Sequence, residues 1–296
     1  MPRRSILSSI ERHALLCIPE TQDELIKHYT FSEADLSLIQ QHRGAANQLG
    51  FAVQLCYMRY PSIILGVDEM PSAMLLRLVS QQLGVDAASW AQYGQREQTR
   101  REHLVELQTA LAFQTFTTTH HYQPTVHGLS DLARQTDKGI VLATALVEKL
   151  RQQKILLPSI NVIERICAEA ITRANRLIYA TLTTPLLSQH HQHLDNLLNI
   201  KEGTKMTWLA WLRQSPAKPN SRHMLEHIER LKTLQAINLP KGIERHIHQN
   251  RLLKIAREGH QMTAADLARF ETQRRYATLV ALVIEGTATV TDEIID

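Results

Sequence analysis

The sequence predicts a mainly α-helical protein with two helical domains in tandem. Leu, Ala, Gln and Arg, which favour helices, are abundant, whereas aromatic residues make up only 5% of the 296 residues. Gly and Pro, which interrupt helices, number only 11 and 10. A chain of this length accommodates two domains of ordinary size. We expect them at residues 1–155 and 156–296, with helix-turn-helix-like elements.

The composition is that of a soluble globular protein. Hydrophobic residues account for 44% of the chain and charged residues for 21%. No apolar run reaches the roughly 18 residues that a membrane-spanning helix needs, and the N-terminus lacks the apolar core of a secretion signal. Cys17, Cys56 and Cys167 are widely separated and form neither a disulfide framework nor a CxxC metal motif. We therefore expect a cytoplasmic protein that does not contact a membrane.

Capping motifs and apolar stripes place the helices of the first half. Residues 21–24 and 32–35 each put a hydroxyl three residues before a carboxylate, which is the spacing of a capping box. Residues 49–58 are apolar almost all round, so we expect a helix at the centre of the first core. Pro61 should end that helix, because the residue before a proline avoids the helical region.

Residues 76–96 fit a helix-turn-helix. Ser80 is the small residue at which two helices cross, and Gly84 is placed to take the left-handed turn. The apolar side chains expected in its core are Val79, Leu83, Val85, Trp90 and Tyr93. The second helix, around residues 86–96, is the one that usually reads the DNA major groove. Any helical hairpin with a glycine turn shows a similar pattern, so the spacing alone leaves DNA binding open.

A long helix is predicted over residues 95–113, with leucines on one face. Arg96, Arg100, Arg101 and His103 cluster at its start. Cations at a helix N-terminus oppose the helix dipole, and an external anion would relieve this conflict. A solvated surface also tolerates such a cluster, so this pattern is only a hint of an anionic partner.

The second half is predicted to be helical as well. Residues 129–158 fit either a second, winged helix-turn-helix or plain helical packing, and Ser159 caps the helix that follows. Thr263 and Asp266 mark the start of the last helix, which stays amphipathic up to Asp296 without a C-terminal cap. We expect from this ending that the chain is a fragment of a longer protein.

Basic residues are concentrated in one part of the chain. The net charge is +4, but residues 205–257 contain eleven basic and three acidic residues, a balance of +8, together with four histidines. A segment this basic in a nearly neutral chain indicates a polyanionic partner. The alternative is a set of solvated helix faces whose acidic partners lie elsewhere in the fold.

No pattern of catalytic residues is visible. The sequence contains no glycine-rich phosphate loop, no GxSxG motif and no cluster of acids that would suit a two-metal site. His190, His191 and His193 are metal ligands by type, but contiguous histidines do not share a helix face. We therefore expect no catalytic residue, no metal and no cofactor. Trp90, Tyr93, Trp208 and Trp211 are expected in the core rather than as base-stacking platforms.

Residues 47–61, NQLGFAVQLCYMRYP, resemble a hallmark of the N-terminal region of the Tn-three family of replicative transposases, the enzymes of class II bacterial transposons. Similar segments follow in order along the chain, at residues 81–85, 99–104, 136–140, 168–176, 212–216, 222–228, 248–254 and 271–277. The resemblance spans essentially the whole chain and is far more specific than the helix-turn-helix pattern.

The resemblance implies that the chain is the DNA-recognition part of a larger transposase. In this family the N-terminal helical domains bind double-stranded DNA at the terminal inverted repeats, and the catalytic acids with their magnesium ions lie in a C-terminal RNase-H-like domain. The chain alone should therefore not be an enzyme. From the resemblance and the basic segments, the DNA-contact candidates are Arg96, Arg100, Arg101, Arg173, Arg176, Arg213, Lys218, Arg222, Arg251 and Lys254.

Two functional hypotheses follow. In the first, these cations neutralise phosphates, the helix at residues 86–96 reads base edges, and two domains grip successive parts of a repeat. Substituting Ala for both Arg100 and Arg101 should then weaken binding to all sequences and flatten the salt slope by about one to two units. In the second, the chain is a truncated helical interaction protein that regulates or assembles with full-length transposase. Self-association would then involve the missing C-terminal parts.

Overall fold

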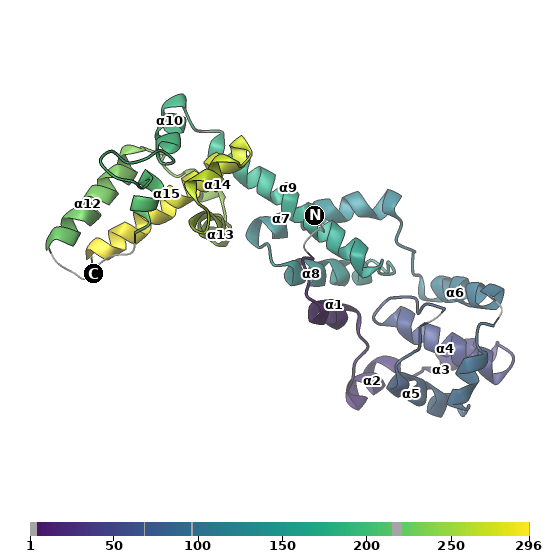
Figure 1. The fold of residues 1–296 in the computed structure, drawn as a ribbon. Coiled ribbons are helices and arrows are strands. Elements are labelled where there is room, and N and C mark those ends of the chain that lie inside the picture. The colour runs from purple at the N-terminus through teal and green to yellow at the C-terminus, as the bar shows by residue number, and fades with distance from the viewer. Residues whose placement is uncertain (1–4, 68, 96, 215–220, 296) are drawn as a thin grey trace. The chain divides into compact units, whose positions relative to one another are not determined.

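The structure is a computed structural model that describes residues 5–67, 69–95, 97–214 and 221–295, without the side chains of residues 221 and 222. Most of these residues lie in helices (Figure 1). Two isolated β-bridges, which join Gln114 to Ile155 and Ile200 to Thr207, are the β-pairings among the described residues. The prediction of a mainly α-helical fold is confirmed.

The chain forms two compact units. Unit 1 comprises Met1–Leu129 and Lys138–Ala168, and unit 2 comprises Ser130–Asp137 and Glu169–Asp296. Helices α7 (Gln123–Gln135) and α9 (Ile160–Thr183) therefore contribute residues to both units. The boundary expected between residues 155 and 156 precedes α9. The compact units divide instead within α9, between Ala168 and Glu169. Helix α9 runs through this division without a break, over 24 residues.

Unit 1 is built around the apolar helix α4 (Ala45–Arg59). All ten residues from Leu49 to Met58 are buried, as predicted, and α4 ends two residues before Pro61. The other elements of unit 1, besides the shared α7 and α9, are α1 (Ser9–Leu16), α2 (Gln22–Tyr29), α3 (Glu33–Gln40), α5 (Ala73–Leu83), η1 (Ala87–Gln92), α6 (Glu97–Leu111), η2 (Thr118–Tyr122) and α8 (Gly139–Gln152).

The turn of the expected helix-turn-helix is present, but its second helix is not an α-helix. Helix α5 ends at Leu83, and Gly84 takes the left-handed conformation with φ of 66°. The chain then forms η1, a 3-10 helix of six residues whose N-cap is Asp86. Tyr93 is extended and packs its ring over Gly50 of α4, so the helix stops there. In the described part of residues 86–96 the predicted recognition helix is thus shortened to a 3-10 helix at Ala87–Gln92.

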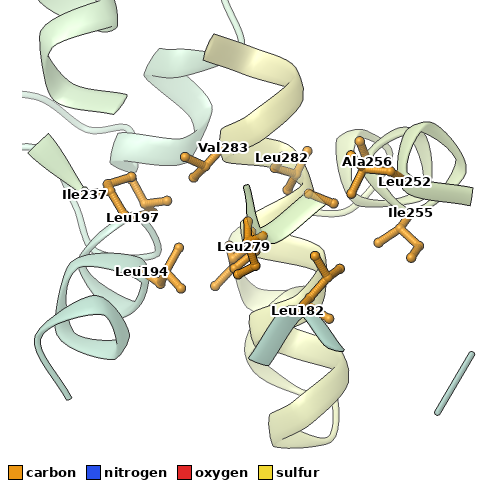
Figure 2. Packing of buried hydrophobic residues seen from close by; sticks show 14 of the residues in the cluster. Leu182, Leu194, Leu197, Ile237, Leu252, Ile255, Ala256, Leu279, Leu282 and Val283 are labelled. Atoms are coloured by element: carbon orange, nitrogen blue, oxygen red, sulfur yellow. The ribbon is translucent and has the colours of Figure 1, made fainter. Parts of the chain in front are cut away.

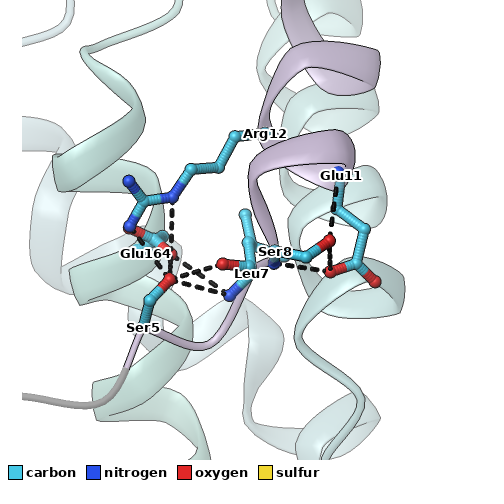
Figure 3. Close-up of polar contacts among 6 residues, drawn as sticks. All are labelled: Ser5, Leu7, Ser8, Glu11, Arg12 and Glu164. Atoms are coloured by element: carbon cyan, nitrogen blue, oxygen red, sulfur yellow. Dashed lines mark hydrogen bonds and ion pairs between the residues drawn. The ribbon is translucent and has the colours of Figure 1, made fainter.

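Polar contacts hold the N-terminal segment against α9 within unit 1 (Figure 3). Ser5 donates a hydrogen bond of 2.7 Å to the carboxylate of Glu164, and the guanidinium of Arg12 lies 2.6 Å from the same carboxylate. Ser8 and Glu11 form a capping box at the start of α1. Because Glu164 is mostly buried, its charge needs these partners.

Unit 2 packs around α15 (Thr272–Ile295). Its other elements, besides the shared α7 and α9, are α10 (Ser188–Asn196), α11 (Trp208–Leu212), α12 (Ser221–Ala236), η3 (Ile243–His246), α13 (Gln249–His260) and α14 (Ala264–Ala268). In the core, Leu279 and Leu282 of α15 pack with Leu252 and Ala256 of α13 (Figure 2). No helix of the described residues is both long and apolar enough to cross a membrane.

The last helix does not begin where the sequence indicated. Thr263 and Asp266 do form a capping box, but the helix that they start, α14, ends after five residues. Glu271 then accepts hydrogen bonds from the backbone amides of Gln273 and Arg274, each of 3.2 Å. These bonds satisfy free amides at the start of a new helix, so α15 begins at Thr272.

Candidate nucleic-acid interface

Arg100, one of the cations expected to contact DNA, lies inside unit 1. The residue is 6% exposed, and its guanidinium donates a hydrogen bond to the carbonyl of Leu65. The same carbonyl accepts from the buried side chain of Gln54 at 3.3 Å. Arg100 thus fastens the loop between α4 and α5 to α6, contrary to its expected position on a phosphate-facing surface.

Arg101, the next residue of α6, has an exposed side chain. Its guanidinium lies 3.1 Å from the carboxylate of Glu97, which is also exposed. An exposed pair one helical turn apart contributes only about 0.3–0.5 kcal/mol, so a phosphate competes with it easily. Arg96, the other candidate near this helix start, lies outside the described residues.

Two candidates lie on the part of α9 that belongs to unit 2. Arg176 is exposed, and Arg173 is partly exposed and lies 2.7 Å from the carboxylate of Glu169. Residues three apart on a helix lie on the same side. The two arginines therefore present positive charge on one face of α9.

Arg213, expected as a DNA contact, has a structural role between α11 and the end of α13. Its guanidinium donates to the carbonyls of Met262 at 2.7 Å and Gly259 at 2.9 Å. Burial lowers the pKa of Arg213 to about 10, so the side chain remains charged at neutral pH. A cation next to the last carbonyls of a helix is favoured by the helix dipole. Arg213 is partly exposed, but its guanidinium is bonded to these two carbonyls, and its expected contact with DNA stays a prediction.

Arg251 and Lys254 of α13 share one carboxylate. Arg251 is 3% exposed, lies 3.1 Å from the carboxylate of Asp137 and donates to the side-chain oxygen of Asn175. The ammonium of Lys254 lies 2.9 Å from Asp137, but about half of that side chain is exposed. Burial raises the pKa of Asp137, but the hydrogen bond from Lys254 and the two cations outweigh it and lower the pKa. Arg251 is therefore an internal residue, whereas Lys254 reaches the surface.

The remaining two candidates are not placed. Lys218 lies outside the described residues, and Arg222 belongs to α12 with its side chain outside them. The exposed or partly exposed candidates are thus Arg101, Arg173, Arg176, Arg213 and Lys254. Arg134 is a further cation, outside this set of candidates, and lies with His246 and His248 along a groove of unit 2. No local pattern signals this groove, because α7 and η3 are far apart in the sequence.

His190 and His191 have structural roles. His190 accepts a hydrogen bond of 2.8 Å from the backbone amide of Leu187 at the start of α10. The ring of His191 packs against Tyr276, with 4.4 Å between ring centroids. Within the described residues, no group of three or more His, Cys, Asp or Glu side chains is arranged to hold a metal ion.

The sequence of the chain matches a protein family and several larger proteins. Residues 6–170 match the family described as "Domain of unknown function (DUF4158)", and the chain belongs to that family. The whole chain is also similar to transposases, which confirms the resemblance to the Tn-three family. It is 71% identical to the transposase for transposon Tn3926 and 66% identical to that for transposon Tn21, both of Escherichia coli. It is 57% identical to the transposase for transposon Tn501 of Pseudomonas aeruginosa.

These matches cover 100% of this chain but only 30% of each relative. The chain therefore spans less than a third of the length of the transposases to which it is similar.

Proposed function

We propose that the chain binds double-stranded DNA at the terminal inverted repeats of a transposon, as the end-recognition part of a transposase. The observation that supports this most directly is the division of its cations into two groups. Arg100 and Arg251 are buried, Arg213 is partly exposed, and the guanidinium of each bonds to other groups of its own unit. Arg101 and Lys254, like the exposed Arg176, extend positive charge to the surface.

In this proposal the exposed cations neutralise phosphates and set the position of the protein on the duplex. Each phosphate that a cation neutralises releases counterions and contributes about 0.9 to the slope of log affinity against log salt concentration. Two units on one chain bind successive parts of a long repeat more tightly than either alone, because the second contact becomes intramolecular. Catalysis is assigned to parts of the transposase that this chain does not cover.

Base reading is not assigned to η1 in this proposal. A six-residue 3-10 helix is short, and Trp90 and Tyr93 pack against unit 1 instead of lying in solvent. We assign the reading of base edges to the exposed faces of longer helices, of which α9 and α13 carry exposed cations. Phosphate contacts from those cations would orient such a face in a groove.

The test is fluorescence anisotropy of the purified chain with a labelled terminal repeat and with a scrambled duplex, at several salt concentrations. Binding of the repeat at least roughly a hundredfold more tightly supports end recognition. Equal and strongly salt-dependent binding to both duplexes contradicts sequence-specific recognition. An absence of binding favours the interaction protein, and magnesium-dependent strand cleavage by the chain would contradict the non-catalytic assignment.

A further inference from the structure

A groove in unit 2 brings together cationic and imidazole side chains from distant parts of the sequence. It has a volume of about 260 Å³ and lies at the end of α7, beside η3 and the start of α13. Its polar lining consists of Asp131, Arg134, Gln135, His246 and His248. Exposed Lys241, Arg245, Lys254 and Arg257 belong to the segment that supplies the two histidines.

Arg134 is held only weakly in this groove. Its guanidinium lies 3.6 Å from the carboxylate of Asp131, three residues earlier on α7. Asp131 is 92% exposed, so water screens the pair strongly. Arg134 can therefore exchange this carboxylate for another anion at little cost, and Asp131 competes with any anion that enters.

The hydrogen-bond geometry of His248 defines what its ring offers to the groove. His248 is the N-cap of α13, and its Nδ1 accepts a hydrogen bond of 3.2 Å from the backbone amide of Asn250. In the neutral imidazole one nitrogen accepts and the other carries the hydrogen. The cap therefore places the hydrogen on Nε2, which makes that nitrogen a donor for an anion.

We propose that this groove binds a backbone phosphate of DNA, with Arg134 as the counter-charge and His246 and His248 as hydrogen-bond donors. Asp131 acts as an internal competitor that occupies Arg134 when DNA is absent. The inference rests on the proposed function and adds to it a phosphate position centred on Arg134, a residue that neither the basic segments nor the family resemblance indicated.

The experiment measures anisotropy of the labelled repeat with the wild-type chain and four variants, as a function of salt. Arg134→Ala should weaken binding about threefold to tenfold and reduce the salt slope by about one unit. Asp131→Asn should tighten binding, because the competing carboxylate is removed while the shape is kept. Arg269→Ala is the matched control: it removes the same charge from an exposed residue of unit 2 that does not line the groove.

The fourth variant separates binding from folding. His248→Asn keeps an N-cap, since Asn caps helices well, but removes the Nε2 donor. It should weaken binding about twofold to fivefold while thermal unfolding, followed by circular dichroism, stays at the wild-type temperature.

Distinct outcomes overturn the groove and the proposed function. Arg134→Ala and Arg269→Ala variants with the same affinity and salt slope would refute the groove while leaving repeat binding intact. Unchanged affinity in the Asp131→Asn variant would refute the competition. A wild-type chain that does not bind the repeat would overturn the proposed function and the groove together.

Discussion

Asp137 and Arg251 form an ion pair of 3.1 Å within unit 2, although more than a hundred residues separate them in the sequence. The Arg251 side chain is almost wholly buried, and its second partner is Asn175 of α9. The pair links the end of the α7 segment to α13, and α13 in turn packs on α15. A basic residue in the most basic part of the chain therefore helps to hold the fold together.

Removing the carboxylate of Asp137 should destabilise unit 2. The substitution Asp137→Ala leaves the buried guanidinium of Arg251 without its counter-charge, at a cost of about 3 kcal/mol in the free energy of unfolding. Urea denaturation followed by circular dichroism measures this loss. Asp131→Ala is the control, because that carboxylate is exposed and its removal should change stability by less than about 0.5 kcal/mol. Equal midpoints for the two variants would contradict the role of the pair.

His103 should make unit 1 less stable in mild acid. The residue is 5% exposed, and burial, with a smaller contribution from nearby His42, lowers its pKa from 6.5 to about 4. Between these values the unfolded chain takes up a proton that the folded chain does not. Stability is therefore complete above about pH 6.5 and falls as the pH decreases towards 4, by an amount on the order of 2 kcal/mol.

Urea midpoints measured from pH 7.5 to pH 4.5 test this dependence. His103→Phe keeps an aromatic ring beside Phe51 and removes the titrating group, so its profile should be flatter. The other ionisable groups around His103 are Tyr93, at 3.3 Å from Nδ1, Glu102, and His42, which lies 3.6 Å from the carboxylate of Glu106. A profile as steep as that of the wild type would show that one of these groups, and not His103, is responsible.

Gly50 should tolerate no side chain. A Cβ at this position would overlap the ring of Tyr93, which packs directly on α4. Gly50→Ala should therefore lower stability by about 1–3 kcal/mol, the usual cost of overpacking. Gly286→Ala is the matched control in a helix, because its Cβ would lie 3.7 Å from Leu234, an ordinary contact. That control should instead be neutral or stabilising by up to about 1 kcal/mol.

A double-mutant cycle checks the cause. Because Tyr93 supplies the overlap, Gly50→Ala should cost less in a Tyr93→Ala background than in the wild type. Costs that simply add would show that the two residues do not meet.

Arg100 and Arg101 should respond differently to substitution, although they are adjacent. Arg100→Ala removes a buried hydrogen bond to Leu65 and should lower stability by about 2 kcal/mol. Arg101→Ala should leave stability within about 0.5 kcal/mol of the wild type and reduce the salt slope of DNA binding by about one unit. In the double variant Arg100→Ala/Arg101→Ala, the first substitution should therefore lower stability and the second should weaken DNA binding. An unchanged salt slope in Arg101→Ala would remove α6 from the proposed interface.

Much of the local structure followed from local patterns. The buried helix at residues 49–58 was predicted because its side chains are apolar on every face, and the capping box at residues 32–35 because its hydroxyl and carboxylate have the right spacing. The left-handed turn at Gly84 was likewise predicted from one residue type. The buried helix, the capping box and the turn each depend on residues that lie within one or two helical turns of one another. Such short-range patterns are visible in the sequence itself.

Features that depend on distant neighbours could not be predicted in this way. The helix after Gly84 is short because Tyr93 packs on Gly50, and no pattern within residues 86–96 reveals that contact. The burial of Arg100 depends on the carbonyl of Leu65, and the burial of Arg251 on the carboxylate of Asp137.

The sequence by itself determined that this protein is helical, where several of its helices begin, and that it belongs with the transposases. Helix formation and capping depend on residues that are close in the sequence. Family membership is identified from similar segments that occur in the same order along the chain. Only the tertiary structure decided which cations face solvent and which are engaged inside the units. A charge can be buried only where the fold supplies a partner for it, and the position of that partner depends on the packing of the whole unit.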